Sequence, residues 1–201
     1  MSIALRTHGA KGRNRVSPAR PAALATTVMI TFGTCLLAAG AASATTVATA
    51  TIGAGTLSVS VPATIGFSAS LNGLDQTVTA ALALDVRDAT GSGNGWSLTA
   101  TSTQFTSGSN TLATNSVTVA SAPGDACDSG ATCALASDSI PYPYSLPAGS
   151  GPPSASKLFD AAASTGMGDQ TVTPTFVLAI PASTAQGTYT STWTISAVSG
   201  P

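Results

Sequence analysis

The chain has 201 residues, of which only 7% are charged, against roughly 25% in ordinary globular proteins. Past residue 44 it carries eight Asp, two basic residues and no His or Glu, so the net charge of this part is two minus eight, or −6. Without His it cannot form a Ser-His-Asp or Cys-His catalytic site, and two basic residues cannot neutralise a run of phosphates. We therefore expect a binding or structural module, not an enzyme, with no cofactor and no nucleic-acid partner.

Residues 1–44 have the three-part layout of a secretory signal peptide. Five positive charges and no negative charge precede an uncharged apolar run over residues 22–39. Ala42-Ser43-Ala44 then supplies the small residues that a signal peptidase recognises. We predict cleavage between Ala44 and Thr45, export of the mature chain, and contact with a membrane only during export.

Two alternatives to a cleaved signal peptide stay open. Residues 22–44 are free of charge over 23 positions, which is long enough to span a bilayer and remain as an anchor. Cys35 could instead carry a lipid, although Phe32-Gly33-Thr34 before it departs from a lipoprotein signal because Thr34 is not Gly or Ala.

Past the signal peptide, short runs of alternating apolar and polar residues predict β-strands. In chain order they span residues 57–61, 63–68, 77–87, 95–102, 116–120, 139–146, 171–180 and 187–198. Alternation with a polar outer face is typical of half-buried antiparallel strands, and no amphipathic helix interrupts them. We predict an all-β fold, in which residues 45–201 form one antiparallel Ig-like β-sandwich.

The strand expected over residues 95–102 places Trp96, Leu98 and Ala100 inward, with Ser97 and Thr99 outward. Gly91-Ser-Gly-Asn-Gly95 before it predicts a flexible hairpin connection. A phosphate-binding loop is the rejected alternative, because a strand and not a helix follows the glycines.

Residues 122–156 contain six prolines, which exclude a central strand, and we expect a long Pro/Gly-rich excursion on the surface. Cys127 and Cys133 lie in it and are the only cysteines past residue 44. Two cysteines in an exported protein favour a disulfide, and Gly130 lets the intervening residues turn back. A redox-active pair remains the alternative.

Four aspartates, Asp85, Asp88, Asp125 and Asp128, could supply oxygen ligands to Ca²⁺. No twelve-residue calcium loop contains them. We therefore interpret them as solvated turn residues and predict no metal site. Asp85 and Asp88 flank Arg87, so a local ion pair is the structural alternative.

Trp96 and Trp193 each fall within an expected strand. On the inward face of a sandwich, such rings usually belong to the core. The functional alternative is a carbohydrate platform, because the face of an aromatic ring stacks on a sugar ring.

The residues around both tryptophans resemble the WxL cell-surface domain family. One block runs from Asp85-Val-Arg87 through Gly95-Trp96-Ser97-Leu98 to Phe105. The closing block contains Ile180-Pro181, Gly187-Thr-Tyr189 and Trp193-Thr194-Ile195, with Ile195 in place of the usual Leu. Residues 55–67, with Gly66-Phe67, are similar to the family's first strand pair.

The resemblance implies a protein of Gram-positive bacteria that is exported and held non-covalently at the cell wall surface. Its implied ligand is peptidoglycan or another wall polymer, and other surface proteins are possible further partners. The residues that would form or maintain the attachment region are Trp96, Ser97, Leu98, Trp193, Thr194 and Ile195.

A structural subunit of a pilus-like or spore-coat-like assembly is the alternative function. Such a subunit needs an unpaired sheet edge and an extended segment that fills it. Residues 45–60 are the candidate for that segment.

Overall fold

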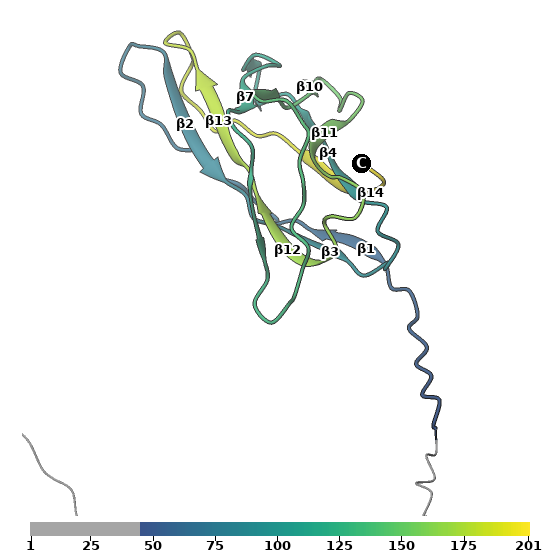
Figure 1. The fold of residues 1–201 in the computed structure, drawn as a ribbon. Coiled ribbons are helices and arrows are strands. Elements are labelled where there is room, and N and C mark those ends of the chain that lie inside the picture. Colours follow the sequence, from purple (N-terminus) through teal and green to yellow (C-terminus); the bar gives the residue numbers. More distant parts are fainter. Residues whose placement is uncertain (1–44) are drawn as a thin grey trace, which may run out of the picture. The chain divides into compact units, whose positions relative to one another are not determined.

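The computed structural model describes residues 45–201, and the expected signal peptide with Cys35 lies outside the described residues. All regular structure in residues 45–201 is β-strand, arranged in several antiparallel sheets (Figure 1). The prediction of an all-β fold is therefore confirmed, and the arrangement is that of a β-sandwich. Among these residues, no helix is long and apolar enough to cross a membrane.

The strands in chain order are β1 (Leu57–Ser60), β2 (Gln76–Ala81), β3 (Leu84–Asp88), β4 (Trp96–Thr103), β5 (Thr106–Ser107), β6 (Asn110–Thr111), β7 (Val117–Val119), β8 (Gly124–Cys127), β9 (Tyr144–Ser145), β10 (Ala148–Gly149), β11 (Ser156–Ala161), β12 (Gly168–Thr173), β13 (Thr175–Ile180) and β14 (Trp193–Ser199).

Two stretches of chain, residues 76–88 (β2 and β3) and residues 168–180 (β12 and β13), each pass from one sheet into another. β2 pairs antiparallel with β13, and β3 pairs antiparallel with β12. Only Pro174 separates β12 from β13, and a proline breaks a central strand because it lacks the N–H. Its carbonyl still accepts the N–H of Leu82 at 3.0 Å, at the break between β2 and β3. Both stretches therefore pass from one sheet to the other at neighbouring positions. The strand order is β1-β3-β12-β8 in one sheet and β2-β13-β7-β9 in the other.

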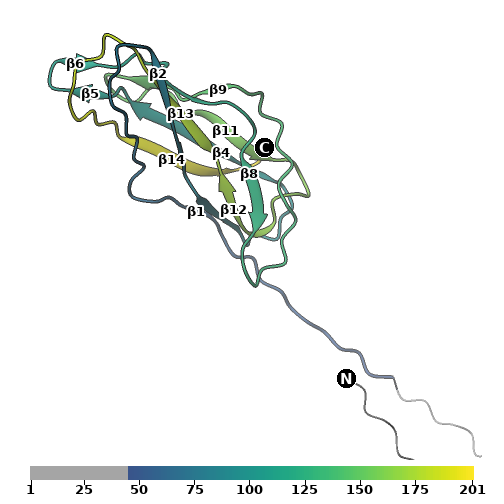
Figure 2. The ribbon, with the colours of Figure 1, turned by 90° about the vertical axis from the view of Figure 1, so that its left-hand side faces the viewer.

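The third sheet is centred on β4. β14 pairs along one edge of β4 and β11 along the other (Figure 2). Beyond β11 on that second edge, β10 pairs with the end of β4. The register sets Trp193 opposite Ser102 and Ser199 opposite Trp96. The two tryptophans therefore lie near opposite ends of the β4–β14 ladder.

The core lies between these sheets and contains the inward residues of the long strands. Trp96, Leu98 and Ala100 are completely buried, as predicted. Ser97, on the opposite face of β4, is buried as well. The outer face of β4 is covered in part by the Pro-rich segment, since the Thr101 hydroxyl donates to the Pro153 carbonyl at 2.8 Å.

Three short segments of residues 122–156 form strands that pair with strands of the sheets. β8 pairs with β12, β9 with β7, and β10 with β4. The Asp138 carboxylate accepts the N–H of Asp160 at 3.1 Å, and the Tyr142 hydroxyl lies 2.8 Å from the Leu158 carbonyl that it can donate to. Cys127 and Cys133 form a disulfide, as predicted.

Other local predictions also differ from the structure. Residues 63–68 form no strand, and regular pairing of the last expected strand begins only at Trp193. The glycine-rich segment Gly91–Gly95 is no hairpin, because β3 and β4 belong to different sheets. The sequence does not predict strand β11. Its adjacent residues Leu158 and Phe159 are both buried, at a register shift, so the segment lacks the alternation of apolar and polar residues.

Candidate functional site

An open groove lies at the end of the sandwich where β13 ends. Its volume is about 740 Å³, which falls within the range of about 300–1,000 Å³ that small-ligand sites occupy. One wall is formed by residues 65–71, before β2, and the other by residues 184–189, between β13 and β14. Phe105, Leu112, Leu178 and Ile180 complete the lining. We call this feature the end groove.

Three half-buried aromatic side chains line the end groove: Phe67, Phe105 and Tyr189. Behind them, the half-buried Trp193 holds two of these rings in place. Its ring centroid lies 6.3 Å from that of Phe67 and 6.5 Å from that of Phe105. The second tryptophan motif therefore contributes to the groove through packing.

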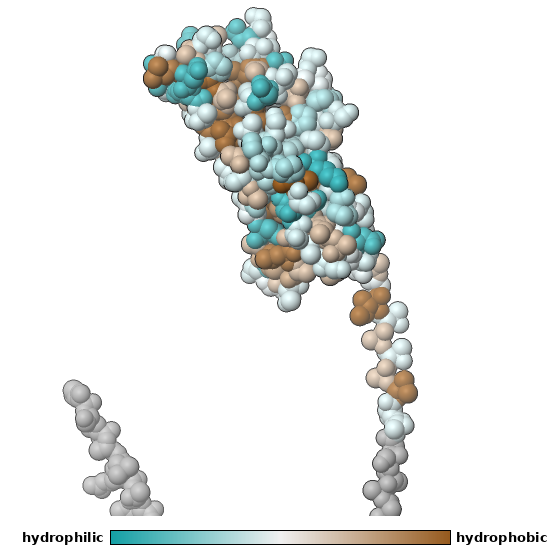
Figure 3. All heavy atoms as spheres, turned by 45° about the horizontal axis from the view of Figure 1, so that its top comes forward, coloured by the Kyte–Doolittle hydropathy of each residue, from teal (hydrophilic) through white to brown (hydrophobic). Residues whose placement is uncertain are grey.

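The polar groups of the end groove are neutral. None of the described residues that line it carries a charge, and the exposed side chains of Ser68, Ser70, Gln186 and Thr188 offer hydroxyl and amide groups. In Figure 3, apolar and hydrophilic residues alternate over the end of the domain that comes forward in this view. A surface that combines aromatic rings with neutral hydrogen-bonding groups suits an uncharged polar ligand.

Local contacts fix the second wall. The Tyr189 hydroxyl donates to the Ala185 carbonyl at 3.0 Å. Gly187 lies so close to Ser107 that a Cβ would stand 2.5 Å from its Oγ. The Gly-x-Tyr sequence thus shapes this wall.

The first tryptophan motif lies elsewhere. Trp96 is completely buried, and its indole N–H donates to the Gly166 carbonyl at 2.8 Å. Ser97 and Leu98 are buried too, so none of the three offers surface to a ligand. This motif packs the core far from the end groove.

The remaining two residues of the predicted attachment region are on β14. Thr194 is exposed on its outer face, whereas Ile195 is half-buried and packs against the core. Of the six predicted residues, Trp193 packs against aromatic rings that line the end groove, and only Thr194 is exposed.

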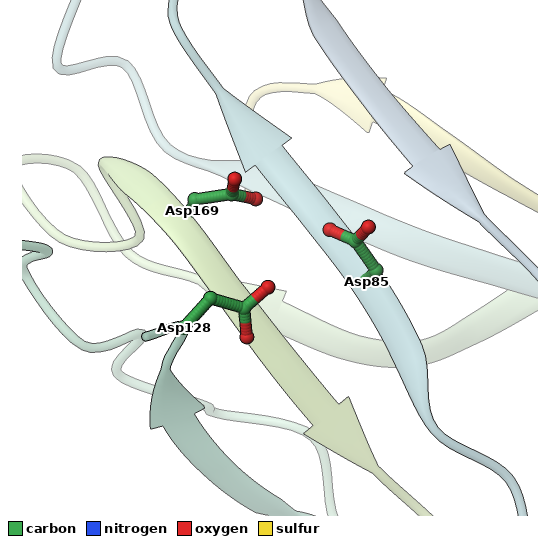
Figure 4. Close-up of side chains that lie close together, drawn as sticks. All are labelled: Asp85, Asp128 and Asp169. Atoms are coloured by element: carbon green, nitrogen blue, oxygen red, sulfur yellow. The ribbon is translucent and has the colours of Figure 1, made fainter. Parts of the chain in front are cut away.

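A second cluster of chemical groups lies on the outer face of the β3–β12–β8 sheet. One carboxylate oxygen from each of Asp85, Asp128 and Asp169 lies within 4.8 Å of the other two (Figure 4). Asp85 and Asp128 are two of the four aspartates considered from the sequence as oxygen ligands, and Asp169 is not among them. Asp88 is instead buried, where its carboxylate accepts the N–H of Thr90.

Two of the three carboxylates in this cluster already have protein partners. The Arg87 Nη2 lies 2.6 Å from Asp169 Oδ2, across the strand pair, so Arg87 pairs with Asp169 and not with Asp85 or Asp88 beside it in the sequence. The Thr171 hydroxyl donates to Asp128 at 2.6 Å. Oxygen ligands at this spacing are of the kind that Ca²⁺ prefers, but exposed carboxylates often cluster without binding an ion, and we assign no function to the cluster.

Two pKa values in the cluster are shifted in opposite directions. Hydrogen bonds from Arg87 lower the pKa of Asp169. Partial burial raises the pKa of Asp85, and the neighbouring Asp169 raises it further. Asp169 Oδ1 is buried and has no hydrogen-bond partner in residues 45–201.

No family model matches the chain, and neither does any curated protein or solved structure. The resemblance to the WxL family thus rests on the residues quoted for it, and the wall-binding role that it implies stays a prediction.

Proposed function

We propose that the chain is an exported bacterial surface protein whose β-sandwich attaches non-covalently to a cell-wall polymer, and that the end groove makes the contact. The observation that carries the proposal is the meeting of three half-buried aromatic rings and neutral polar side chains in one open groove. The aromatic side chains of binding sites combine large apolar contact area with fixed geometry, which is what a sugar ring needs.

Two sequence features support the same assignment. The closing block that resembles the WxL family supplies the Gly-x-Tyr wall and the Trp193 ring behind the groove. The charge pattern of residues 1–44 favours export, which would bring the domain to the wall. Peptidoglycan is the wall polymer that the resemblance implies.

A sedimentation assay of the exported protein with purified cell wall tests this function. The wild type should pellet with the wall. The double variant Gln186→Ala/Thr188→Ala removes two exposed polar side chains of the groove and should leave more protein in the supernatant. Because both side chains are exposed, the melting temperature should stay unchanged.

Thr194→Ala is the matched control. It truncates an exposed threonine on β14 that the WxL resemblance marks but that does not line the groove. Loss of pelleting by Thr194→Ala alone would move the contact to the outer face of β14. A wild type that stays in the supernatant, or that forms concentration-dependent polymers in place of wall complexes, would overturn the proposal and favour the structural subunit.

A further inference from the structure

We infer that the end groove selects an uncharged glycan strand and rejects wall polymers whose backbone carries a negative charge on its repeating units, such as a phosphate or a uronate. This inference rests on the proposed function, because it names the class of polymer that the same groove would bind. It follows from the distribution of charge, from the aromatic lining, and from the shape of the groove.

The first argument is the absence of cations where a polyanion would need them. The two basic residues among the described residues are Arg87 on β3 and Lys157 on β11, and neither lines the groove. Arg87 is already paired with Asp169. A polymer of repeated negative charges would therefore meet no compensating charge, and the −6 of residues 45–201 would repel it.

The second argument is the way in which the aromatic side chains are supported. Phe67 and Phe105 meet edge to face, with centroids 6.2 Å apart and planes at 83°. Trp193 packs against both rings, and Trp193 in turn packs against the buried Phe176, with ring centroids 4.7 Å apart. Rings held in this way lose little conformational entropy on binding, so a neutral ligand can be held without ion pairs.

The third argument is the neutral polar rim. Exposed Ser68 and Ser70 stand on one wall, and exposed Gln186 and Thr188 on the other. Hydroxyls and a primary amide both donate and accept hydrogen bonds, as the hydroxyls and acetamido groups of sugars do. Because the groove is open to solvent, a polymer can reach these groups without entering a closed pocket.

Tyr189 is the residue through which stacking can be tested. Tyr189→Phe keeps the ring and loses the hydroxyl that donates to Ala185. Tyr189→Leu keeps an apolar side chain and loses the ring. If the strand stacks on the ring, Tyr189→Phe should bind within about threefold of the wild type and Tyr189→Leu about tenfold more weakly, as expected for the loss of an interaction of about 1.4 kcal/mol.

The experiment measures binding of the exported protein to two probes in solution: oligomers of β-1,4-linked N-acetylglucosamine, which are uncharged, and oligogalacturonate, which is anionic. The uncharged oligomer should bind, release the protein from purified wall, and keep its affinity as salt is raised, because ion pairs are screened by salt and neutral contacts are not. Oligogalacturonate should neither bind the protein nor release it from the wall. Ser70→Lys, which places a cation on the groove wall, should gain binding to oligogalacturonate and lose that gain in high salt.

The outcomes separate this inference from the proposed function. Wall binding that only oligogalacturonate competes for, or that salt abolishes, would overturn the uncharged-glycan assignment and leave wall attachment standing. Wall binding that neither probe affects, with Tyr189→Leu equal to the wild type, would also overturn it. A protein that does not bind the wall at all would remove the proposed function, whatever the probes show.

Discussion

Trp193 lies against the buried ring of Phe176, with the ring centroids 4.7 Å apart and the planes inclined by 64°. The indole of Trp193 is half-buried and packs against two aromatic side chains of the end groove. Trp96 is completely buried at the other end of the β4–β14 ladder. Substitutions at the two tryptophans should therefore have different consequences.

Trp96→Phe should destabilise the fold by about 1–3 kcal/mol, because the buried hydrogen bond to the Gly166 carbonyl is lost and the smaller ring leaves a void. Trp96→Ala should cost about 3–5 kcal/mol. Trp193→Phe should cost less than Trp96→Phe, because Trp193 is partly exposed. Unfolding in denaturant measures both.

Wall pelleting supplies the second readout for the tryptophan variants. Folded Trp96→Phe should pellet like the wild type, since Trp96 has no surface at the groove. Trp193→Phe should pellet more weakly because the rings of Phe67 and Phe105 lose part of their support. The opposite order would show that the first motif, and not the second, maintains the contact surface.

The core strands could be predicted from the sequence because their alternation is local. Trp96, Leu98 and Ala100 repeat with period two and are buried as predicted. β11 could not be predicted in this way, because a register shift between Lys157 and Phe159 leaves Leu158 and Phe159 both buried. A strand covered on both faces carries no alternation.

The candidate site was only partly predictable. Trp193 was recognised from its motif, but the groove itself is made by residues 65–71 and 184–189, which form no strand and meet only through the folded sheets. Asp169 was missed because its approach to Asp85 depends on the pairing of β3 with β12. Such pairings between distant segments leave no local pattern.

Gly95→Ala should destabilise the domain more than Gly91→Ala. Both glycines have positive φ, at 74° and 66°, so alanine at either position is strained by about 1–2 kcal/mol. A Cβ at Gly95 would also collide with the Ala161 carbonyl, whereas Gly91 faces open space. Equal melting temperatures of the two variants would contradict this packing.

The double substitution Cys127→Ser/Cys133→Ser should cost about 2–3 kcal/mol at most, because the disulfide closes only a short loop. The domain should still fold, since β8 keeps its pairing with β12. Circular dichroism and thermal unfolding measure both effects. Mass spectrometry of the exported protein should find no free thiol on either cysteine, and two free thiols would remove the bridge.

The N-terminus of the exported protein should be at or within a few residues of Thr45. The small residues of Ala42-Ser43-Ala44 satisfy the signal peptidase, and residues 1–44 would be removed. Intact-mass measurement of secreted material checks this. Protein that still carries Arg6 to Arg20 would contradict cleavage and favour an anchor.

Asp125 should make the domain less stable as the pH rises through the carboxyl range. Burial raises the pKa of its carboxyl above the ordinary value, and the N–H groups of Ala136 and Ala126 oppose the shift only in part. The folded protein therefore binds this proton more tightly than the unfolded chain does, so the free energy of unfolding should rise as the pH falls from the folded pKa towards the ordinary one.

Asp125→Asn isolates this contribution from that of the other carboxyls. The amide oxygen can still accept the N–H of Ala136, which now donates to Oδ2 at 2.8 Å, while the buried Oδ1 that lacks a partner within residues 45–201 is replaced by a neutral group that is easier to bury. We expect the variant to be at least as stable as the wild type at pH 7, with the advantage shrinking as the pH falls and Asp125 becomes protonated. Urea unfolding of both proteins at several pH values measures that difference. An advantage for the wild type at pH 7 that disappears in acid would mean that the ionised carboxylate stabilises the fold, with the folded pKa of Asp125 lowered and not raised.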